Sequence, residues 1–242
     1  MTEKANTESA ESTIDTPKPI ATKPNAARPA VGRIIKFAGT DWIVLDVQDN
    51  KALIISKQIL EKRQYHTEPE RIFWKDSTLR EYLNCEFYNR FSEKSKAAIA
   101  ETHITTPANP WYGTSGGSDT TDKIFILSLE EISRYFGNSG ALAQKQGRHI
   151  SYFYVKKDEC VQINKPDLSQ WCEFGDQFNS ARIAHDNTGK PQRWWLRDPG
   201  SSECYATYVF NNGTVDVAGV SVHAEQCGDF YYGVRPALWL NL

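Results

Sequence analysis

From residue 31 onward, short apolar runs alternate with clusters of turn-forming residues, a pattern best suited to antiparallel strands. The first three runs are Ile34–Phe37, Trp42–Val47 and Ala52–Ser56. Gly39–Asp41 and Gln48–Asn50 separate them. Because each gap is only a few residues long, consecutive runs can pair with each other, and the segment predicts an antiparallel meander.

The same alternation returns in the C-terminal third of the chain. Ala206–Phe210 and Thr214–Val217 flank Asn211-Asn212-Gly213. Since an Asn-Gly pair readily takes positive φ at both turn positions, we predict a tight β-hairpin here. The final run, Val234–Leu240, predicts a closing strand. We expect the first and last strands of the domain to pair with each other.

Serine residues mark the expected helices. Ser77 precedes the apolar stripe of Thr78–Leu83 and is a candidate N-cap. A second short helix is expected over Ser92–Ala100. Ser128 and Glu131 match a capping box, which predicts a helix that runs to about Phe136.

The rest of the chain is expected to be mostly loop. Residues 106–123 and 137–190 are polar and lack sustained periodicity. The exceptions are a strand at Ile124–Leu127 and short elements at Ile150–Val155 and around Phe178–Ala184.

Aromatic residues are absent from residues 1–30 and abundant afterwards, with 7 Trp, 11 Tyr and 11 Phe in the whole chain. The first segment cannot bury enough apolar surface to offset its ordering entropy, and its four prolines keep it extended. We therefore predict a disordered tail or linker over residues 1–30 and one domain over residues 31–242.

Charge and hydropathy exclude two classes of function. The formal net charge is -2 and no basic stripe is present, which argues against nucleic-acid binding. No apolar stretch is long enough to span a membrane, so no membrane insertion is expected. The N-terminus lacks the apolar core of a signal peptide, which favours the cytoplasm, although a phage particle or the cell surface remains open.

The five cysteines are widely spaced and form no C-x-x-C pair, which excludes a zinc ribbon or a thioredoxin-like motif. Reduced, mostly buried thiols are expected. Cys204 and Cys227 could close a loop in an oxidising compartment.

Two multi-residue blocks carry a resemblance to a known family: WWLRDPG at 194–200 and GVRPALWL at 233–240. With WKDSTLREYLN at 74–84 and TTDKIFILS at 120–128, they resemble a widespread bacterial domain family of unknown function, found in gut firmicutes and their phages. The resemblance covers essentially all of residues 31–242.

The ending GVRPAL also resembles the closing strand of the formylglycine-generating enzyme superfamily, distantly. That resemblance implies an α+β, C-type-lectin-like fold: a small twisted antiparallel sheet, two or three helices, long irregular loops and paired terminal strands. The variable proteins of diversity-generating retroelements use the same fold and bind through the segment before the closing strand. The resemblance thus implies a binding surface between Pro199 and Gly233, one that could itself be diversified.

The segment 200–232 is rich in Tyr, Ser, Asn and Asp, a mixture typical of binding loops. An ordinary polar meander has a similar composition, so both interpretations stay open. The candidate ligand contacts are Tyr205, Tyr208, Asn211, His223, Glu225, Asp229 and Tyr231. A protein or a glycan is the expected ligand.

Residues inside the two blocks are expected to be structural. Trp194 and Trp195 are adjacent in an apolar run, and we expect both side chains in the core, on opposite faces of one strand. Arg197 and Arg235 lie in packed segments, where an arginine normally pairs with a carboxylate or caps carbonyl groups.

No catalytic motif is recognisable, and we expect a binding module rather than an enzyme, with no cofactor. The chain has no phosphate-binding glycine loop or H-E-x-x-H sequence, and no calcium-loop or histidine-pair spacing. Its one G-x-S-x-G match, at residues 113–117, lies in the stretch predicted as loop and not between a strand and a helix, so it is no nucleophile elbow. Two alternatives stay open: a metal-dependent oxidase of the formylglycine-generating type, and a structural tip of a phage or cell surface.

Overall fold

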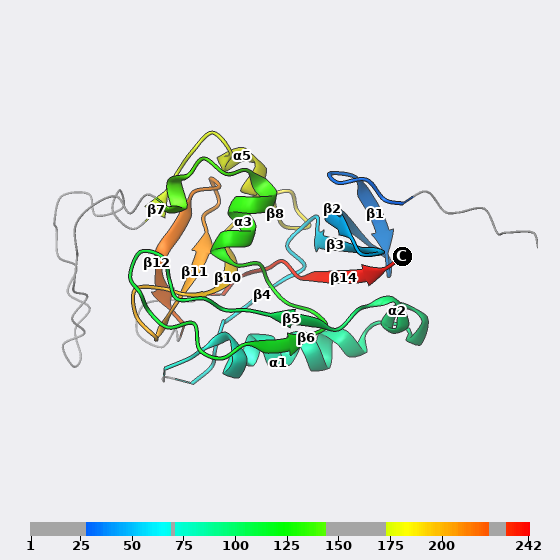
Figure 1. Ribbon diagram of the computed structural model, residues 1–242, viewed down its shortest axis with the longest axis horizontal. Helices are drawn as coiled ribbons and strands as arrows, with labels where there is room; N and C mark the ends of the chain where they lie inside the picture. Colours follow the sequence, from blue (N-terminus) through cyan, green and yellow to red (C-terminus); the bar gives the residue numbers. More distant parts are fainter. Residues whose placement is uncertain (1–27, 69–70, 144–172, 223–230) are drawn as a thin grey trace, which may run out of the picture.

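The computed structural model describes residues 28–68, 71–143, 173–222 and 231–242. Within them the protein is mixed α/β, with mostly antiparallel sheets and few helices (Figure 1). Most of the expected tail and the element expected at Ile150–Val155 lie outside the described residues.

The first sheet has four antiparallel strands in the order β1-β2-β3-β14. Their bounds are β1 Ile34–Phe37, β2 Thr40–Gln48, β3 Lys51–Ser56 and β14 Ala237–Asn241. The predicted N-terminal meander is therefore confirmed. Asp49 and Asn50 both have positive φ between β2 and β3, the conformation that a two-residue hairpin turn requires.

The closing strand differs from its prediction in two respects. It joins the N-terminal sheet but pairs with β3, as in Leu238 opposite Ile54, while β1 forms the opposite edge. The expected pairing of the first and last strands is therefore wrong. The run Val234–Leu240 is also divided, because Pro236 has no N–H to donate to a ladder. The chain passes there from β13 (Tyr232–Val234) in the second sheet to β14 in the first.

The second sheet has six strands in the order β4-β13-β10-β11-β12-β7. Their remaining bounds are β4 Glu61–Arg63, β7 Glu173–Phe174, β10 Trp194–Pro199, β11 Tyr205–Val209 and β12 Val215–Ser221. All neighbours are antiparallel except β10 and β13. Two small ribbons complete the strands: β5 (Thr102–Ile104) with β6 (Thr120–Asp122), and β8 (Ala184–His185) with β9 (Pro191–Gln192).

The expected strand at Ile124–Leu127 is wrong, apart from a single bridge between Phe125 and Ala237. The run is buried, as its apolar sequence predicts. Two of its carbonyl groups, however, bond to side chains: Arg197 donates to the Ile126 oxygen and Asn84 to the Ile124 oxygen. The Phe125 and Leu127 oxygens accept the backbone N–H groups of Ala237 and Arg197. An apolar run of this length cannot be distinguished from a strand by its pattern alone. The neighbouring stretch predicted as loop contains β6.

The two expected serine caps, Ser77 and Ser128, are confirmed, and Ser92 is a third. Ser77, Ser92 and Ser128 accept hydrogen bonds from the N–H groups of the first helical turns, and the Ser128–Glu131 capping box is complete. The helices are α1 (Thr78–Tyr82), α2 (Glu93–Ala98), α3 (Leu129–Phe136) and α5 (Asn179–Arg182). Short 3-10 turns form η1 (Trp74–Asp76) and η3 (Ala141–Ala143), and a π-helical turn, η2 (Leu83–Phe87), follows α1 directly. Figure 1 shows α3 beside β10, and α1 beside the β5–β6 ribbon.

The hairpin of β11 and β12 is confirmed, but its turn differs from the expected one. Among Asn211, Asn212 and Gly213, only Gly213 has positive φ, at 85°. The loop closes through a hydrogen bond from the Phe210 N–H to the Thr214 oxygen. A Cβ at Gly213 would lie 1.9 Å from the Asn179 oxygen, so packing against α5 also requires glycine.

Both adjacent tryptophans are fully buried, as predicted. Trp194 donates to the Arg182 oxygen at 3.0 Å and Trp195 to the Arg63 oxygen at 2.9 Å. Because consecutive strand residues point to opposite faces, β10 anchors packing on both sides of the second sheet.

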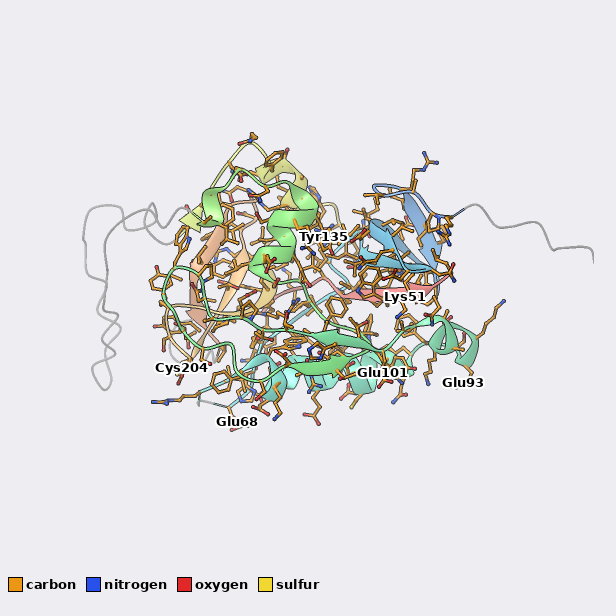
Figure 2. All side chains as sticks on the ribbon, in the orientation of Figure 1. Lys51, Glu68, Glu93, Glu101, Tyr135 and Cys204 are labelled. Atoms are coloured by element: carbon orange, nitrogen blue, oxygen red, sulfur yellow. The ribbon has the colours of Figure 1, made fainter. Side chains whose placement is uncertain are left out.

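The cysteines only partly fit the expectation of buried thiols. Cys85 is exposed and Cys204 is half-buried, and both are free thiols (Cys204 is labelled in Figure 2). The other three cysteines lie outside the described residues, including Cys227, the suggested partner of Cys204.

Candidate functional site

An open groove of about 420 Å³ lies between the helical segment α1–η2 and the chain around the end of β4. The helical wall contributes Thr78, Leu79, Glu81, Tyr82, Cys85 and Glu86, and the other wall contributes Arg63, Gln64, Thr67 and Tyr231. Figure 2 labels Glu68, which follows Thr67 in the chain, next to α1 at the edge of the molecule. This volume falls in the usual range for small-ligand sites.

The helical wall contains the π-helical turn at Leu83–Phe87, and π turns are frequent at functional sites. Asn84 stabilises this turn. Its Nδ2 donates to the oxygens of Arg80 and Ile124, and its Oδ1 accepts from the N–H groups of Lys123 and Ile124. Three of these four bonds connect the turn to the segment after β6, and together they fix the positions of Cys85 and Glu86 in the groove wall.

Tyr82 and Arg63, which line the groove, belong to a network of paired charges that we call its floor. Tyr82 donates a hydrogen bond to Glu61, and Glu61 pairs with Arg63 at 3.0 Å and with Arg90 at 3.6 Å. The Arg63 guanidinium lies 3.3 Å from the centroid of the Tyr82 ring, a close cation–π contact. Burial, followed by the bond to Glu61, raises the pKa of Tyr82 to about 12. Tyr82 is therefore a neutral donor at physiological pH, and the floor is ordered before any ligand arrives.

An aromatic cluster lies beside the groove. Tyr208 contacts Phe210 and Tyr232 at centroid distances of 4.8 and 4.7 Å, and Tyr232 contacts Trp195 at 4.6 Å. The exposed Arg193 lies over Phe210 at 5.1 Å and donates to the Tyr232 hydroxyl. Because Tyr231 directly precedes β13, this cluster holds the strand that presents Tyr231 to the groove.

The structure separates the residues predicted to contact a ligand. Tyr231 lines the groove and is 48% exposed. Asn211 is exposed in the hairpin turn, at the end of the sheet where β13 begins. Tyr205 is half-buried at the other end of β11, about 20 Å of extended chain from Asn211. His223, Glu225 and Asp229 lie outside the described residues.

Tyr208 is placed differently from the expected exposed contact. It is 5% exposed and hydrogen-bonded to Asp216, which also accepts the Gly219 N–H. Burial raises the pKa of Asp216 to about 6, and these two hydrogen bonds act in the opposite direction. Tyr208 therefore supports the aromatic cluster and offers little surface to a ligand.

Most of the groove was not anticipated from the sequence. The segments Arg63–Thr67 and Thr78–Glu86 lie far from residues 200–232 in the chain. Thr78–Phe87 has the pattern of an ordinary amphipathic helix, and no residue in it indicates a π turn. The closest signal is Asn84 inside the helical stripe, since asparagine inside a helix often bonds to backbone groups.

The two arginines of the family blocks are structural, as predicted. Arg197 pairs with Glu131 at 2.5 Å and donates to the Ile126 oxygen. Arg235 donates to the Ser56 oxygen and lies 5.1 Å from the centroid of the Trp194 ring. Burial lowers the pKa of Arg235 to about 10.

A second, smaller cavity of about 140 Å³ lies beside the Arg197–Glu131 pair. It is below the usual size of a small-ligand site. Among the described residues, no group of three or more His, Cys, Asp or Glu side chains is arranged to hold a metal ion. Nor is any helix in these residues long and apolar enough to cross a membrane.

The fold and site define a mixed α/β domain of two main sheets with an open polar groove. The chain belongs to the family described as a domain of unknown function (DUF6273), whose match covers residues 49–242. The expected family of unknown function is confirmed at this level, with a match that begins later than residue 31. Neither the curated proteins nor the solved structures gave a match to this chain.

Proposed function

We propose that this domain is a non-catalytic ligand-binding module and that its ligand, a glycan or a protein, occupies the groove lined by Tyr231. The observation that carries the proposal is the groove itself: an exposed aromatic side chain above an ordered floor of paired charges. Preorganised polar groups beside an exposed tyrosine suit recognition, because little entropy is lost when a ligand binds.

A C-type-lectin-like fold is part of the proposal. Antiparallel sheets, few short helices, long irregular connections and a last strand that returns to the N-terminal sheet support it. In this scheme the sheets and the tryptophan core form a rigid scaffold, and the hairpin turn at Asn211 can vary without loss of stability. Such variation would suit a diversified binding protein.

The test is capture with the full chain as bait, from host-cell lysate and surface extract. Parallel baits carry Tyr231→Ala, or Tyr205→Ala as a matched control at the far end of β11. We expect one partner to be captured by the wild-type and Tyr205→Ala baits and lost with Tyr231→Ala. The affinity of the purified partner is then measured by calorimetry, with an expected loss of about tenfold or more for Tyr231→Ala.

Two results would contradict the proposal. One is equal capture by all three baits after circular dichroism has shown each to be folded, because the groove would then be irrelevant to binding. The other is stoichiometric copper or iron in the purified protein, with a reaction that depends on it, which would favour the oxidase alternative.

A further inference from the structure

We propose that the groove binds a saccharide that carries no acidic group, and that it does so without a metal ion. This inference rests on the proposed function and names its ligand class. It combines the size of the groove, the position of Tyr231, the hydrogen-bonding groups of the walls and the sign of their charge.

The shape of the groove favours a small polar ligand over a flat protein surface. Its volume of about 420 Å³ suits a small ligand, whereas a stable protein interface buries roughly 800 Å² on each partner around an apolar centre. Only four large apolar or aromatic side chains are exposed among the described residues, and Tyr231 is the one in the groove. A single amphipathic ring above polar walls resembles a stacking platform for the C–H face of a sugar ring.

The polar walls match hydroxyl groups, each of which both donates and accepts hydrogen bonds. Gln64, Thr67 and Thr78 can do both, whereas Glu81 and Glu86 only accept. A ligand made of adjacent hydroxyls can satisfy this mixed set, while a ligand with only donors or only acceptors cannot.

The charge of the groove selects against acidic sugars. Glu81 and Glu86 form no ion pair within the described part of the chain, whereas Glu61 is shared by Arg63 at 3.0 Å and Arg90 at 3.6 Å. The three carboxylates outnumber the two guanidinium groups, so a ligand carboxylate or sulfate would meet a net negative charge. A neutral or amino sugar avoids this repulsion.

The groove offers hydrogen-bonding groups and an aromatic ring, which can bind a saccharide without a metal ion. Glu81, Cys85 and Glu86 line one wall, yet they are not arranged as a group that could hold an ion. Direct hydrogen bonds and stacking therefore carry the binding, and a chelator should leave it unchanged.

The experiment is ligand-observed NMR on the full chain, followed by titration. The neutral probes are the β-1,4-linked N-acetylglucosamine trimer, mannotriose and lactose, and 3′-sialyllactose is the acidic probe matched to lactose. We expect at least one neutral probe to bind below about 10 mM, about tenfold more weakly with Tyr231→Ala or with Glu86→Gln. Tyr205→Ala and EDTA should have no effect, and 3′-sialyllactose should bind more weakly than lactose.

The inference is overturned if none of the neutral probes binds at about 10 mM, if the acidic probe binds as well as its neutral match, or if EDTA abolishes binding. Its failure is distinguishable from that of the proposed function. A protein partner that is captured in a Tyr231-dependent manner, and is still captured after periodate destroys its sugars, would leave the module intact and exclude a saccharide ligand.

Discussion

Asp198 gives the sharpest test of how the core is built. This carboxyl group is 1% exposed and accepts the Leu129 N–H at 2.7 Å, at the first turn of α3. Burial raises its pKa from 3.8 to about 6, and the nearby Arg197 acts in the opposite direction. Between about pH 4 and about pH 6 the folded protein therefore binds more protons than the unfolded chain.

The raised pKa of Asp198 makes the free energy of unfolding depend on pH. Stability from this group is fully present below about pH 4 and is lost as the pH rises through about 6. A shift of about two pKa units corresponds to about 3 kcal/mol in the free energy of unfolding. Asp198→Asn keeps an acceptor for the Leu129 N–H but cannot ionise, so relative to wild type it should gain about 3 kcal/mol as the pH rises from about 4 to about 7.

Urea titrations of both proteins across this pH range supply the assay. Each titration series gives the free energy of unfolding as a function of pH. Asp216, whose pKa is also raised, contributes equally to both proteins, so its contribution cancels when one curve is subtracted from the other. Any effect of the amide that does not depend on pH shifts the whole difference by a constant. Asp186→Asn is a control that should leave the pH dependence over this range unchanged, because the Thr188 hydroxyl lowers the pKa of Asp186 to about 2 and the group is ionised in the folded and unfolded chain above about pH 4. Parallel curves for wild type and Asp198→Asn would show that the pKa of Asp198 is not raised in the folded protein.

Three further substitutions test other parts of the structure in the same urea assay. Gly213→Ala should lose about 2 kcal/mol or more, because its φ is 85° and the new methyl group would meet the Asn179 oxygen; wild-type stability would contradict this. Arg235→Met should be as stable as wild type, because one guanidinium nitrogen has no partner among the described residues and the charge is buried; a loss above about 2 kcal/mol would show that the charge matters. Asn84→Ala should lose about 2–4 kcal/mol through orphaned backbone groups, whereas Asn89→Ala, an exposed control, should not.

The local signals in the sequence were sufficient for much of the fold. The sequence predicts the serine caps, the Asp49-Asn50 turn and the burial of the adjacent tryptophans. Each of these features depends on residues close to it in the chain, so a local pattern is enough. The closing run is different, since its division at Pro236 depends on which sheet each half joins. That choice is made by tertiary packing and leaves no local pattern.

The candidate site was only partly predictable for the same reason. Tyr231 was identified from composition, but the groove walls come from segments more than a hundred residues earlier in the chain. Tyr208 shows the limit of composition, because a tyrosine in a polar segment can equally be a buried ring bonded to a carboxylate. Only the pairing of β11 with β10 and β12 distinguishes the two.

The most direct test of the central claim is photo-crosslinking from the groove itself. The full chain carries p-benzoylphenylalanine in place of Tyr231 or, as a control, in place of Tyr205, and is irradiated in host lysate and surface extract. We expect a discrete adduct from position 231, absent from position 205, because only the groove residue contacts the ligand. An adduct from position 205 with none from position 231, or equal adducts from both, would contradict it.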